Sequence, residues 1–324
     1  MTAEPLLTLD GVRKRYRVRS GGAFARREVD LWAVDGVSMR LAAGETVGIV
    51  GESGCGKTTT ARMALRLEAP SEGRVLFDGA DVSLLTGDGL RRYRASVQAV
   101  FQDPWSSLNP RMRVGSIITE PLRVNTDLGR ADLAGRAAEL LDQVGLKPWQ
   151  ARLYPHEFSG GQRQRITIAR AISLSPRLIV LDEPVSALDV SVQAQIMNLL
   201  RDLQDQLGLA YMLIAHSLGT VRYLCHHVVV MYLGRIVESA DAATIFSQPK
   251  HPYSQALIAA ALPGRPGEGG DDFPVLEGEV PSPVAPPPGC RFHPRCPHAV
   301  AVCRTTAPAV RQEGGSTVAC HLYG

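Results

Sequence analysis

The sequence lacks any long apolar run. No stretch among its 324 residues approaches the roughly 20 consecutive apolar residues that a membrane-spanning helix needs. Residues 1–5 lack the basic-then-apolar pattern of a secretory signal. The formal net charge is only +3, which gives no argument for a nucleic-acid partner. We therefore expect a cytoplasmic protein that binds no nucleic acid, and any membrane role to arise by docking to a membrane partner.

Structural disulfides are also not expected, because a cytosolic compartment keeps thiols reduced. Six cysteines nevertheless occur, and they are unevenly placed. Cys55 and Cys225 stand alone, whereas the other four crowd the C-terminal residues: Cys290, Cys296, Cys303 and Cys320. This cluster needs another explanation, such as a metal.

The sequence GESGCGKT at residues 51–58 matches G-x-x-x-x-G-K-[ST], the pattern of a phosphate-binding P-loop. Residues 46–50 before it predict a short buried strand, and residues 59–67 after it predict a helix. A loop in this position turns several backbone N–H groups towards one point at a helix N-terminus, where they favour an anion. A glycine-rich turn that matches by chance is the alternative, and the flanking strand and helix argue against it.

Three glycines let this loop fold tightly and approach a phosphate without a Cβ clash: Gly51, Gly54 and Gly56. Lys57 is expected to reach the β- and γ-phosphates of a nucleotide. The Thr58 hydroxyl is expected to ligate Mg²⁺. The loop therefore predicts a site for a nucleotide and its magnesium ion.

Apolar runs and alternation predict the other core elements. The expected strands are residues 6–9, 37–41, 73–77, 97–101, 178–181, 210–215, 228–232 and 235–238. The expected helices are residues 130–144, 162–173 and 190–207. Residues 20–22 predict a surface loop, and the last strand pair closes a first domain near residue 245.

Polar residues end three of these strands. Gln102 can ligate Mg²⁺ and position water, although glutamines at strand ends are usually only solvated. Asp182 and Glu183 follow a wholly apolar strand, at the edge where α/β sheets bind nucleotides. We expect Asp182 to hold Mg²⁺ and Glu183 to polarise the attacking water; a strand-capping acidic turn is disfavoured by the P-loop upstream. His216 can hydrogen-bond a γ-phosphate, or it can cap the helix that starts near Leu218.

Small residues precede the helix expected at residues 162–173. Ser159 fits its N-cap, and the sequence from Ser159 to Gln162 makes a second helix N-terminus suited to an anion. Because the P-loop already provides one phosphate site, this second site indicates a nucleotide shared between two chains. Tyr16, after the first strand, can stack on a purine ring or pack half-buried, and its chemistry alone favours neither.

These motifs stand in one order within residues 5–245: the P-loop, Gln102, the sequence SGGQRQR from Ser159, Asp182-Glu183 and His216. The chain thereby resembles the ATP-binding subunit of ABC transporters, and the SGGQRQR sequence is the most specific part of that resemblance. The resemblance implies an α/β fold, a P-loop NTPase ABC cassette. Such a cassette comprises a RecA-like core, an antiparallel β subdomain and a helical signature subdomain, followed here by a small Cys-rich C-terminal extension.

The resemblance also implies a role for each motif residue. Tyr16 would stack on adenine, and the Walker A loop would contact the nucleotide through Gly51, Ser53, Gly54, Cys55, Gly56, Lys57, Thr58 and Thr59. Mg²⁺ would be held by Thr58, Gln102 and Asp182. Catalysis would depend on Glu183, His216, Gln102 and Lys57. The ATP bound by the opposite subunit would be completed by Ser159, Gly160, Gly161, Gln162 and the D-loop residue Asp189.

Several short sequences resemble the oligopeptide/dipeptide importer branch: residues 51–54 (GESG), 101–104 (FQDP), 107–112 (SLNPRM), 231–238 (MYLGRIVE) and 251–253 (HPY). Two departures occur. Ser217 stands where the branch usually has Asp, and Cys225-His226-His227 replaces a more acidic stretch. Neither touches a phosphate ligand, so we expect activity to survive. The two histidines suggest surface packing rather than a metal.

Beyond the predicted cassette of residues 1–245, we expect an extension of residues 246–324. Residues 263–289 are rich in Pro and Gly and predict an extended tether. In residues 290–324 the cysteine spacing is C-x5-C-x6-C-x16-C, wider than the C-x2-C pairs of zinc sites. That spacing suits an iron–sulfur cluster, and the importer branch carries a similar tail associated with a 4Fe-4S cluster. We expect an iron–sulfur centre at Cys290, Cys296, Cys303 and Cys320, with Zn²⁺ as the alternative and His293, His298 and His321 as substitute ligands.

The resemblance implies an ATPase that drives uptake of di- or oligopeptides through two transmembrane permease subunits, at the cytoplasmic face of the inner or plasma membrane. A second ABC ATPase, a paralogue or a second copy of this chain, and an extracytoplasmic solute-binding protein would complete the importer. Alternatives are an importer ATPase for nickel or another small solute, a soluble non-transport ABC ATPase, and an ATP-binding module without turnover. The single cassette argues against the soluble class, and the intact catalytic residues argue against the module.

Overall fold

The computed structural model describes residues 4–20, 27–261 and 278–324, and their contacts divide the chain into two compact units. Unit 1 comprises Met1–Leu41, Val47–Ser83 and Ala215–Gly324. Unit 2 comprises Ala42–Thr46 and Leu84–Ile214. The predicted tether lies partly outside the described residues, as does the predicted loop at residues 20–22.

Unit 1 contains an antiparallel sheet in the order β2-β1-β4-β5. Its strands are β1 (Leu7–Ser20), β2 (Arg27–Leu41), β4 (Glu72–Phe77) and β5 (Ala80–Asp81). The long strands β1 and β2 pair from Leu7↔Leu41 to Ser20↔Arg27. The analysis of the sequence predicted only the inner parts of these two strands, although Val29 and Leu31 alternate with Glu28 and Asp30 in the outer part of β2. A cross-strand ion pair joins Arg15 to Asp30 there at 3.0 Å.

A second set of strands in unit 1 follows the order β11-β12-β10-β9-β3. These strands are β3 (Thr46–Val50), β9 (His227–Tyr232), β10 (Arg235–Asp241), β11 (Val310–Glu313) and β12 (Ser316–Ala319). The strands β3 and β9 are parallel, and the other pairs are antiparallel. All five residues of β3 are buried, which confirms the predicted short buried strand.

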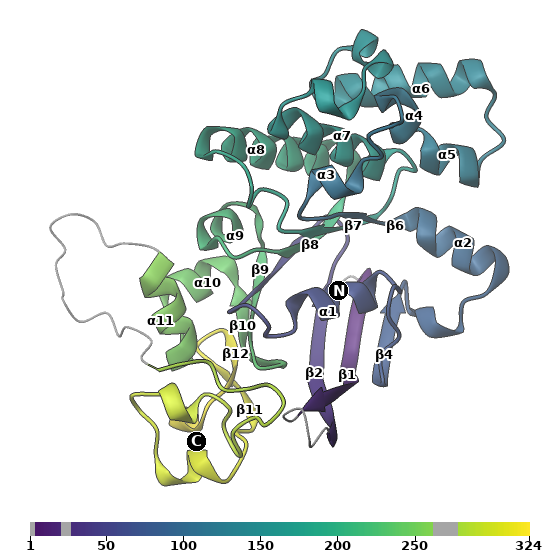
Figure 1. Ribbon diagram of the computed structural model, residues 1–324. Helices are drawn as coiled ribbons and strands as arrows, with labels where there is room; N and C mark the ends of the chain where they lie inside the picture. Colours follow the sequence, from purple (N-terminus) through teal and green to yellow (C-terminus); the bar gives the residue numbers. More distant parts are fainter. Residues whose placement is uncertain (1–3, 21–26, 262–277) are drawn as a thin grey trace, which may run out of the picture. The chain divides into compact units, whose positions relative to one another are not determined.

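Short helices complete unit 1, and Figure 1 shows α9, α10 and α11 beside β9 and β10. The helices are α1 (Lys57–Ala64), α9 (Leu218–Leu224), α10 (Ala242–Ser247) and α11 (Pro252–Ala261). The 3-10 turns are η1 (Val82–Leu84), η4 (His293–Arg295), η5 (Ala301–Arg304) and η6 (His321–Tyr323).

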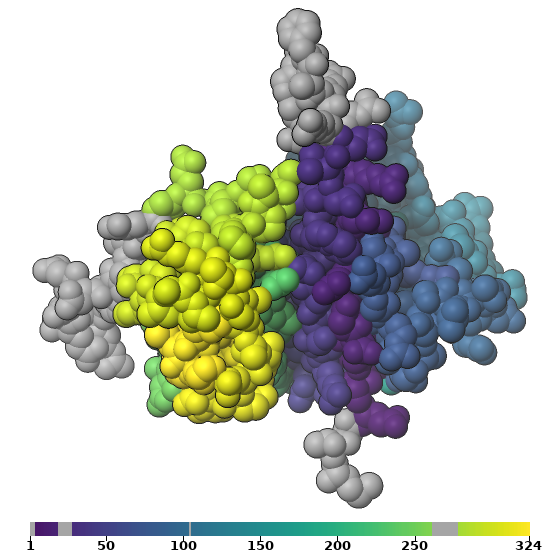
Figure 2. Space-filling model, turned by 90° about the horizontal axis from the view of Figure 1, so that it is seen from below, coloured from purple at the N-terminus to yellow at the C-terminus, as the bar shows by residue number. Residues whose placement is uncertain are grey.

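The C-terminal residues are built into unit 1. The strand β12 pairs with β10, and Phe292 is buried with its ring edge-on to Tyr232, 5.3 Å between centroids. Figure 2 shows these residues, in yellow, gathered in one mass beside the purple N-terminal strands. The extension therefore shares the core of unit 1, and the domain boundary at residue 245 stays a prediction.

Unit 2 holds three parallel strands in the order β8-β7-β6: β6 (Val97–Val100), β7 (Leu178–Asp182) and β8 (Ala210–Ile214). Its helices, drawn in blue to green in Figure 1, are α2 (Gly87–Ser96), α3 (Pro104–Ser107), α4 (Val114–Ile118), α5 (Glu120–Asn125), α6 (Arg130–Gln143), α7 (Gly160–Ile172) and α8 (Val190–Leu207). The turns η2 (Pro148–Arg152) and η3 (Pro155–Glu157) lie between α6 and α7. Of all helices in the described parts of the chain, none has the length and apolar character to cross a bilayer.

Candidate nucleotide-binding site

The P-loop of unit 1 joins the buried strand β3 to α1, as predicted, although α1 begins at Lys57 and ends at Ala64. Two of its glycines leave no room for a side chain. A Cβ on Gly51 would lie 2.2 Å from the Met231 carbonyl oxygen, and a Cβ on Gly56 would lie 2.4 Å from the Ala33 carbonyl oxygen. Both glycines also have positive φ, which disfavours any other residue.

Lys57 lies at the loop and is only 5% exposed. Its Nζ donates hydrogen bonds to the carbonyl oxygens of Gly51 at 2.7 Å and Glu52 at 3.0 Å. The cation is therefore fixed beside the backbone that is expected to bind phosphate. Thr58 is exposed, and Ser53 and Gly54 are exposed with it. Burial raises the pKa of the Cys55 thiol, so this residue packs as a neutral side chain.

Tyr16 lies beside the first turn of α1. Its hydroxyl is hydrogen-bonded to the Glu68 carboxylate and to Thr59, and the Lys14 ammonium lies 5.4 Å from its ring centroid. Burial and the bond to Glu68 raise the pKa of Tyr16. The structure thus brings the predicted adenine-stacking residue to the P-loop helix, and it adds Glu68, which no sequence pattern had singled out.

In unit 2 the structure brings Gln102 and Glu183 together. The Gln102 side-chain amide donates a hydrogen bond of 2.8 Å to a Glu183 carboxylate oxygen. Glu183 has φ of 52°, in the left-handed region, and its backbone N–H donates to the Ile214 carbonyl at 2.9 Å. Asp182 is the last residue of β7. A non-glycine residue held at positive φ beside a strand end is common at functional sites, where surrounding contacts maintain the strain.

The SGGQ sequence begins α7 with a reciprocal cap. The Ser159 hydroxyl accepts from the Gln162 backbone N–H at 3.4 Å, and the Gln162 side chain accepts from the Ser159 N–H at 3.0 Å. The predicted N-cap is therefore confirmed. Gly161 is required by packing, since a Cβ there would lie 2.4 Å from Val192 on α8. Asp189 is the exposed N-cap residue of α8.

His216 is exposed in unit 1, just before α9. The helix cap is Ser217, whose hydroxyl accepts from the Thr220 N–H at 3.4 Å, so a capping role for His216 is excluded. Cys225 is buried and packs against β3, while His227 lies 3.4 Å from the Asp241 carboxylate. The predicted nucleotide residues are thus divided: Tyr16, the P-loop and His216 belong to unit 1, and Gln102, the SGGQ residues, Asp182, Glu183 and Asp189 belong to unit 2.

The four C-terminal cysteines line one small cavity together with His293, His298 and His321. Within the described residues, however, no group of three or more His, Cys, Asp or Glu side chains is arranged to hold a metal ion. Burial raises the pKa of Cys320 to about 11, and the neighbouring thiols add to that rise. The predicted 4Fe-4S cluster is therefore not supported by the arrangement of its expected ligands, although the residues do converge on one place.

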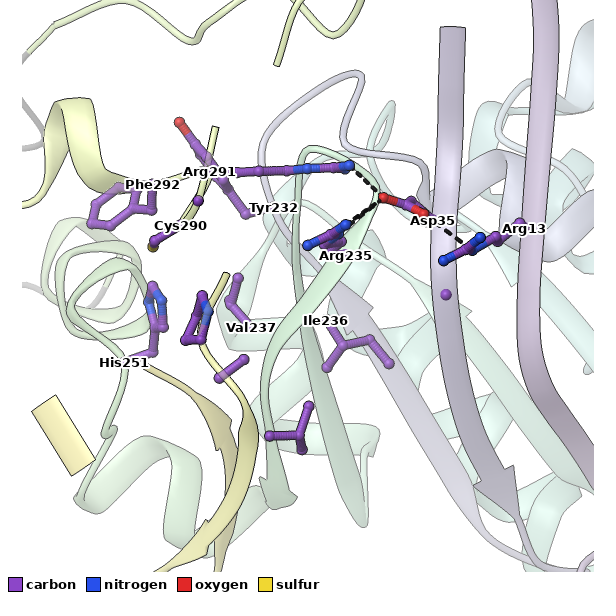
Figure 3. A pocket seen from close by; sticks show the side chains of 15 residues that line it. Arg13, Asp35, Tyr232, Arg235, Ile236, Val237, His251, Cys290, Arg291 and Phe292 are labelled. Carbon is purple, nitrogen blue, oxygen red and sulfur yellow. Dashed lines mark hydrogen bonds and ion pairs between the residues drawn. The ribbon is translucent and has the colours of Figure 1, made fainter. Parts of the chain in front are cut away.

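Asp35 of β2 lines a second pocket in unit 1, and Figure 3 shows three arginines around its carboxylate. Arg235 donates to Asp35 at 2.9 Å, and the Arg13 Nε lies 3.2 Å from its carboxylate. Arg291 also pairs with Asp35, and it belongs to the C-terminal segment, by which we mean residues 278–324. Burial acts to raise the pKa of Asp35, but the arginines outweigh it and hold the pKa below its usual range. This cluster fastens the C-terminal segment to β2.

Comparison with known proteins identifies the family to which this chain belongs. The profile described as ABC transporter matches residues 34–186, and the profile described as oligopeptide/dipeptide transporter, C-terminal region, matches residues 237–303. The oligopeptide transport ATP-binding protein AppF of Bacillus subtilis is 49% identical, over 99% of this chain and 98% of its own. The dipeptide transport ATP-binding protein DppF of Escherichia coli is 44% identical, over 98% of this chain and 94% of its own.

A solved structure of an ABC transporter component also resembles this chain. The cbiO1 protein of Clostridium perfringens, described as part of the ABC transporter complex cbiONQ, matches with a TM-score of 0.65 and 28% identity, over 75% of this chain and 91% of that one. The chain belongs to the ABC transporter family of ATP-binding proteins. Within that family it has the C-terminal region of the oligopeptide/dipeptide branch. The predicted family, branch, cassette fold and ATPase class are thereby confirmed.

Proposed function

We propose that this chain hydrolyses ATP to drive the import of di- or oligopeptides through partner permease subunits. The proposal is supported by similarity to peptide-transport ATP-binding proteins along nearly the whole chain. The observation that carries the catalytic part is the hydrogen bond of 2.8 Å between Gln102 and Glu183, because it orients a carboxylate that follows a buried strand.

In this proposal the P-loop N–H groups and Lys57 bind the phosphates, and Tyr16 stacks on adenine. Mg²⁺ would be held by Thr58, Gln102 and Asp182 and would neutralise phosphate charge. Glu183 accepts a proton from the attacking water, and the Gln102 amide keeps its carboxylate in position. His216 hydrogen-bonds the γ-phosphate. Phosphoryl transfer needs this positioning and charge neutralisation more than covalent help.

The second half of each ATP site comes from another chain. The first turn of α7 has N–H groups without helical acceptors, which suits a γ-phosphate of the opposite subunit's ATP. Ser159, Gly160, Gly161, Gln162 and Asp189 supply these contacts. Closure of two cassettes on two ATP molecules moves the permeases, and hydrolysis opens the pair again by weakening the closed state.

The test of this mechanism is Glu183→Gln, which keeps the shape and the Gln102 contact while removing the base. ATP hydrolysis is expected to fall by roughly 10²–10⁴-fold while ATP binding is retained. The trapped ATP is expected to hold two chains together, as measured by light scattering. Asp202→Asn, which changes an exposed carboxylate of the same unit, is the matched control and should hydrolyse ATP normally. Unchanged hydrolysis by Glu183→Gln would contradict the assignment.

The partners in this proposal are two permeases, a second ABC ATPase and an extracytoplasmic solute-binding protein. The second ATPase is a paralogue, or else another copy of this chain, and the complex lies at the cytoplasmic face of the membrane. Co-purification from membranes distinguishes the candidates: permeases with a peptide-loaded receptor support peptide import. A nickel-loaded receptor would support the other importer class, and the absence of permeases would support a soluble ABC ATPase.

We also propose a metal centre at the four C-terminal cysteines, an iron–sulfur cluster with Zn²⁺ as the alternative. Support comes from one cavity that these four residues line together with four histidines, His251, His293, His298 and His321. Ligand thiols must lose their protons, so metal binding is expected to release protons and to depend on pH. Anaerobic purification followed by metal analysis and absorbance spectroscopy is the test. Iron with sulfide, or zinc, would support the centre, and a metal-free chain that folds and hydrolyses ATP would contradict it.

A further inference from the structure

The second residue of the P-loop is held by the C-terminal part of the chain. Arg295 of η4 forms a two-bond ion pair with Glu52, from Nη1 to Oε2 at 2.8 Å and from Nη2 to Oε1 at 3.0 Å. The Tyr253 hydroxyl of α11 accepts a hydrogen bond from the Glu52 backbone N–H at 2.8 Å. Two residues that lie more than 200 positions from Glu52 therefore fix both its side chain and its backbone.

Both partners are themselves fixed. The Arg295 side chain is 5% exposed and the Tyr253 residue is fully buried. Tyr253 packs against Tyr232 and Phe292, with ring centroids 4.8 Å and 5.4 Å away. The Arg295 guanidinium also donates to the Tyr232 hydroxyl at 3.5 Å. A two-bond arginine–carboxylate pair with little solvent around it is geometrically specific, unlike an exposed ion pair.

The contact continues into the catalytic part of the loop. The Glu52 carbonyl accepts from the Lys57 Nζ at 3.0 Å and from the Cys55 N–H at 3.3 Å. Displacement of Glu52 would therefore move an acceptor that positions Lys57. The negative charge of Glu52 also has a consequence. A carboxylate in a phosphate-binding loop repels the phosphate unless a cation neutralises the carboxylate. Arg295 supplies that cation.

We propose that Arg295 and Tyr253 are positioning residues for the P-loop, through which the docked C-terminal segment sets the affinity of the site for ATP. This inference rests on the proposed ATPase function. It goes further because it gives the extension a direct part in nucleotide binding.

The chain offers a matched control. Arg291, four residues before Arg295, fastens the same segment to Asp35 and not to the P-loop; Figure 3 shows it reaching that carboxylate. Arg291→Gln removes the contacts to Asp35 and to the Leu233 carbonyl, and Arg295→Gln removes those to Glu52 and to the Tyr232 hydroxyl. Both variants weaken the docking of the segment, but only Arg295→Gln removes the arginine from the Glu52 carboxylate. Arg304→Gln, at an exposed position of the same segment, tests for a general effect of charge.

The experiment measures ATP affinity of the full chain by titration calorimetry, with MgATP hydrolysis as a second readout. Arg295→Gln is expected to weaken ATP binding about tenfold or more, with KM raised more than kcat is lowered. Arg295→Lys should recover part of the loss. The double variant Glu52→Gln/Arg295→Gln should bind within about threefold of the parent, because the uncompensated charge is gone. Arg291→Gln and Arg304→Gln should stay within about twofold.

Equal losses in Arg295→Gln and Arg291→Gln, or no recovery in the double variant, would overturn the inference. If Arg295→Gln does not fold, Tyr253→Phe must by itself weaken ATP binding, since it removes one hydroxyl from a ring that stays packed; unchanged binding in that variant overturns the inference. The variant Lys57→Ala distinguishes failure of the proposed function from failure of this inference. If Lys57→Ala does not reduce ATP binding by the parent chain, both the proposed function and this inference are refuted. If Lys57→Ala reduces ATP binding but Arg295→Gln does not, only this inference is refuted.

Discussion

The contact between β3 and α9 allows a stability prediction that can be worked from distances. Gly48, in the middle of β3, faces Cys225, and a Cβ built on Gly48 would lie 2.6 Å from the Cys225 sulfur and 3.0 Å from Val221. The same Cβ would lie 3.5 Å from the Cys225 Cβ, which is ordinary contact. The sulfur atom therefore occupies the space that any other residue at position 48 would need.

Gly48→Ala is expected to lower the free energy of unfolding by about 1–3 kcal/mol through overpacking, less roughly 0.5–1 kcal/mol because alanine loses less backbone entropy on folding. Cys225→Ala removes one buried sulfur and is expected to lower it by about 1–2 kcal/mol. In the double variant the new methyl group takes part of the space of the lost sulfur. The two losses should then fall short of additivity by about 1 kcal/mol or more.

Urea unfolding of the full chain, followed by circular dichroism, measures all three variants. Gly219→Ala in α9 is the control, because its new Cβ would meet only the Ser217 hydroxyl, at 3.6 Å. It should be neutral or slightly stabilising. Strict additivity of the Gly48 and Cys225 changes, or a Gly48→Ala loss no larger than that of Gly219→Ala, would refute the reasoning.

Two further predictions concern burial and packing. Burial lowers the pKa of His251 to about 3, so between pH ~6.5 and ~3 the unfolded chain binds a proton that the native chain does not. Stability is then lost as the pH falls through this window, by up to about 1.4 kcal/mol per pH unit, and His251→Asn should flatten that slope in melting experiments. Equal slopes in the two proteins would contradict this. Gly161→Ala should destabilise unit 2 by about 1–3 kcal/mol, and Val192→Ala in the same chain should recover part of the loss; a failure to recover any would show that the α7–α8 contact is not the cause.

Local patterns in the sequence were sufficient to predict those features that depend on interactions between nearby residues. The strand β3, the helix α8 and the Ser159 cap lie where the sequence predicts them, because burial periodicity and capping chemistry act over a few residues. The P-loop was predicted for the same reason. The outer parts of β1 and β2 were missed although Val29 and Leu31 alternate there with Glu28 and Asp30; strand pairing and cross-strand charges stabilise these parts.

The cysteine cluster, in contrast, shows what spacing along the sequence does not predict. Its spacing predicted an iron–sulfur centre in the C-terminal extension. The structure instead builds that tail into unit 1 through β12 and the buried ring of Phe292. Spacing along the chain sets how far apart the thiols can be, but their final geometry depends on the packing around them.

By itself, the sequence determined that this protein is an ABC-type ATP-binding protein, since a phosphate loop, a capped SGGQ helix and a strand-end carboxylate pair are each written in a few adjacent residues. Only the tertiary structure decided that Gln102 orients Glu183 and that Arg295 and Tyr253 hold Glu52. Those contacts join residues far apart in the chain. Their existence depends on how whole elements pack, which no local pattern encodes.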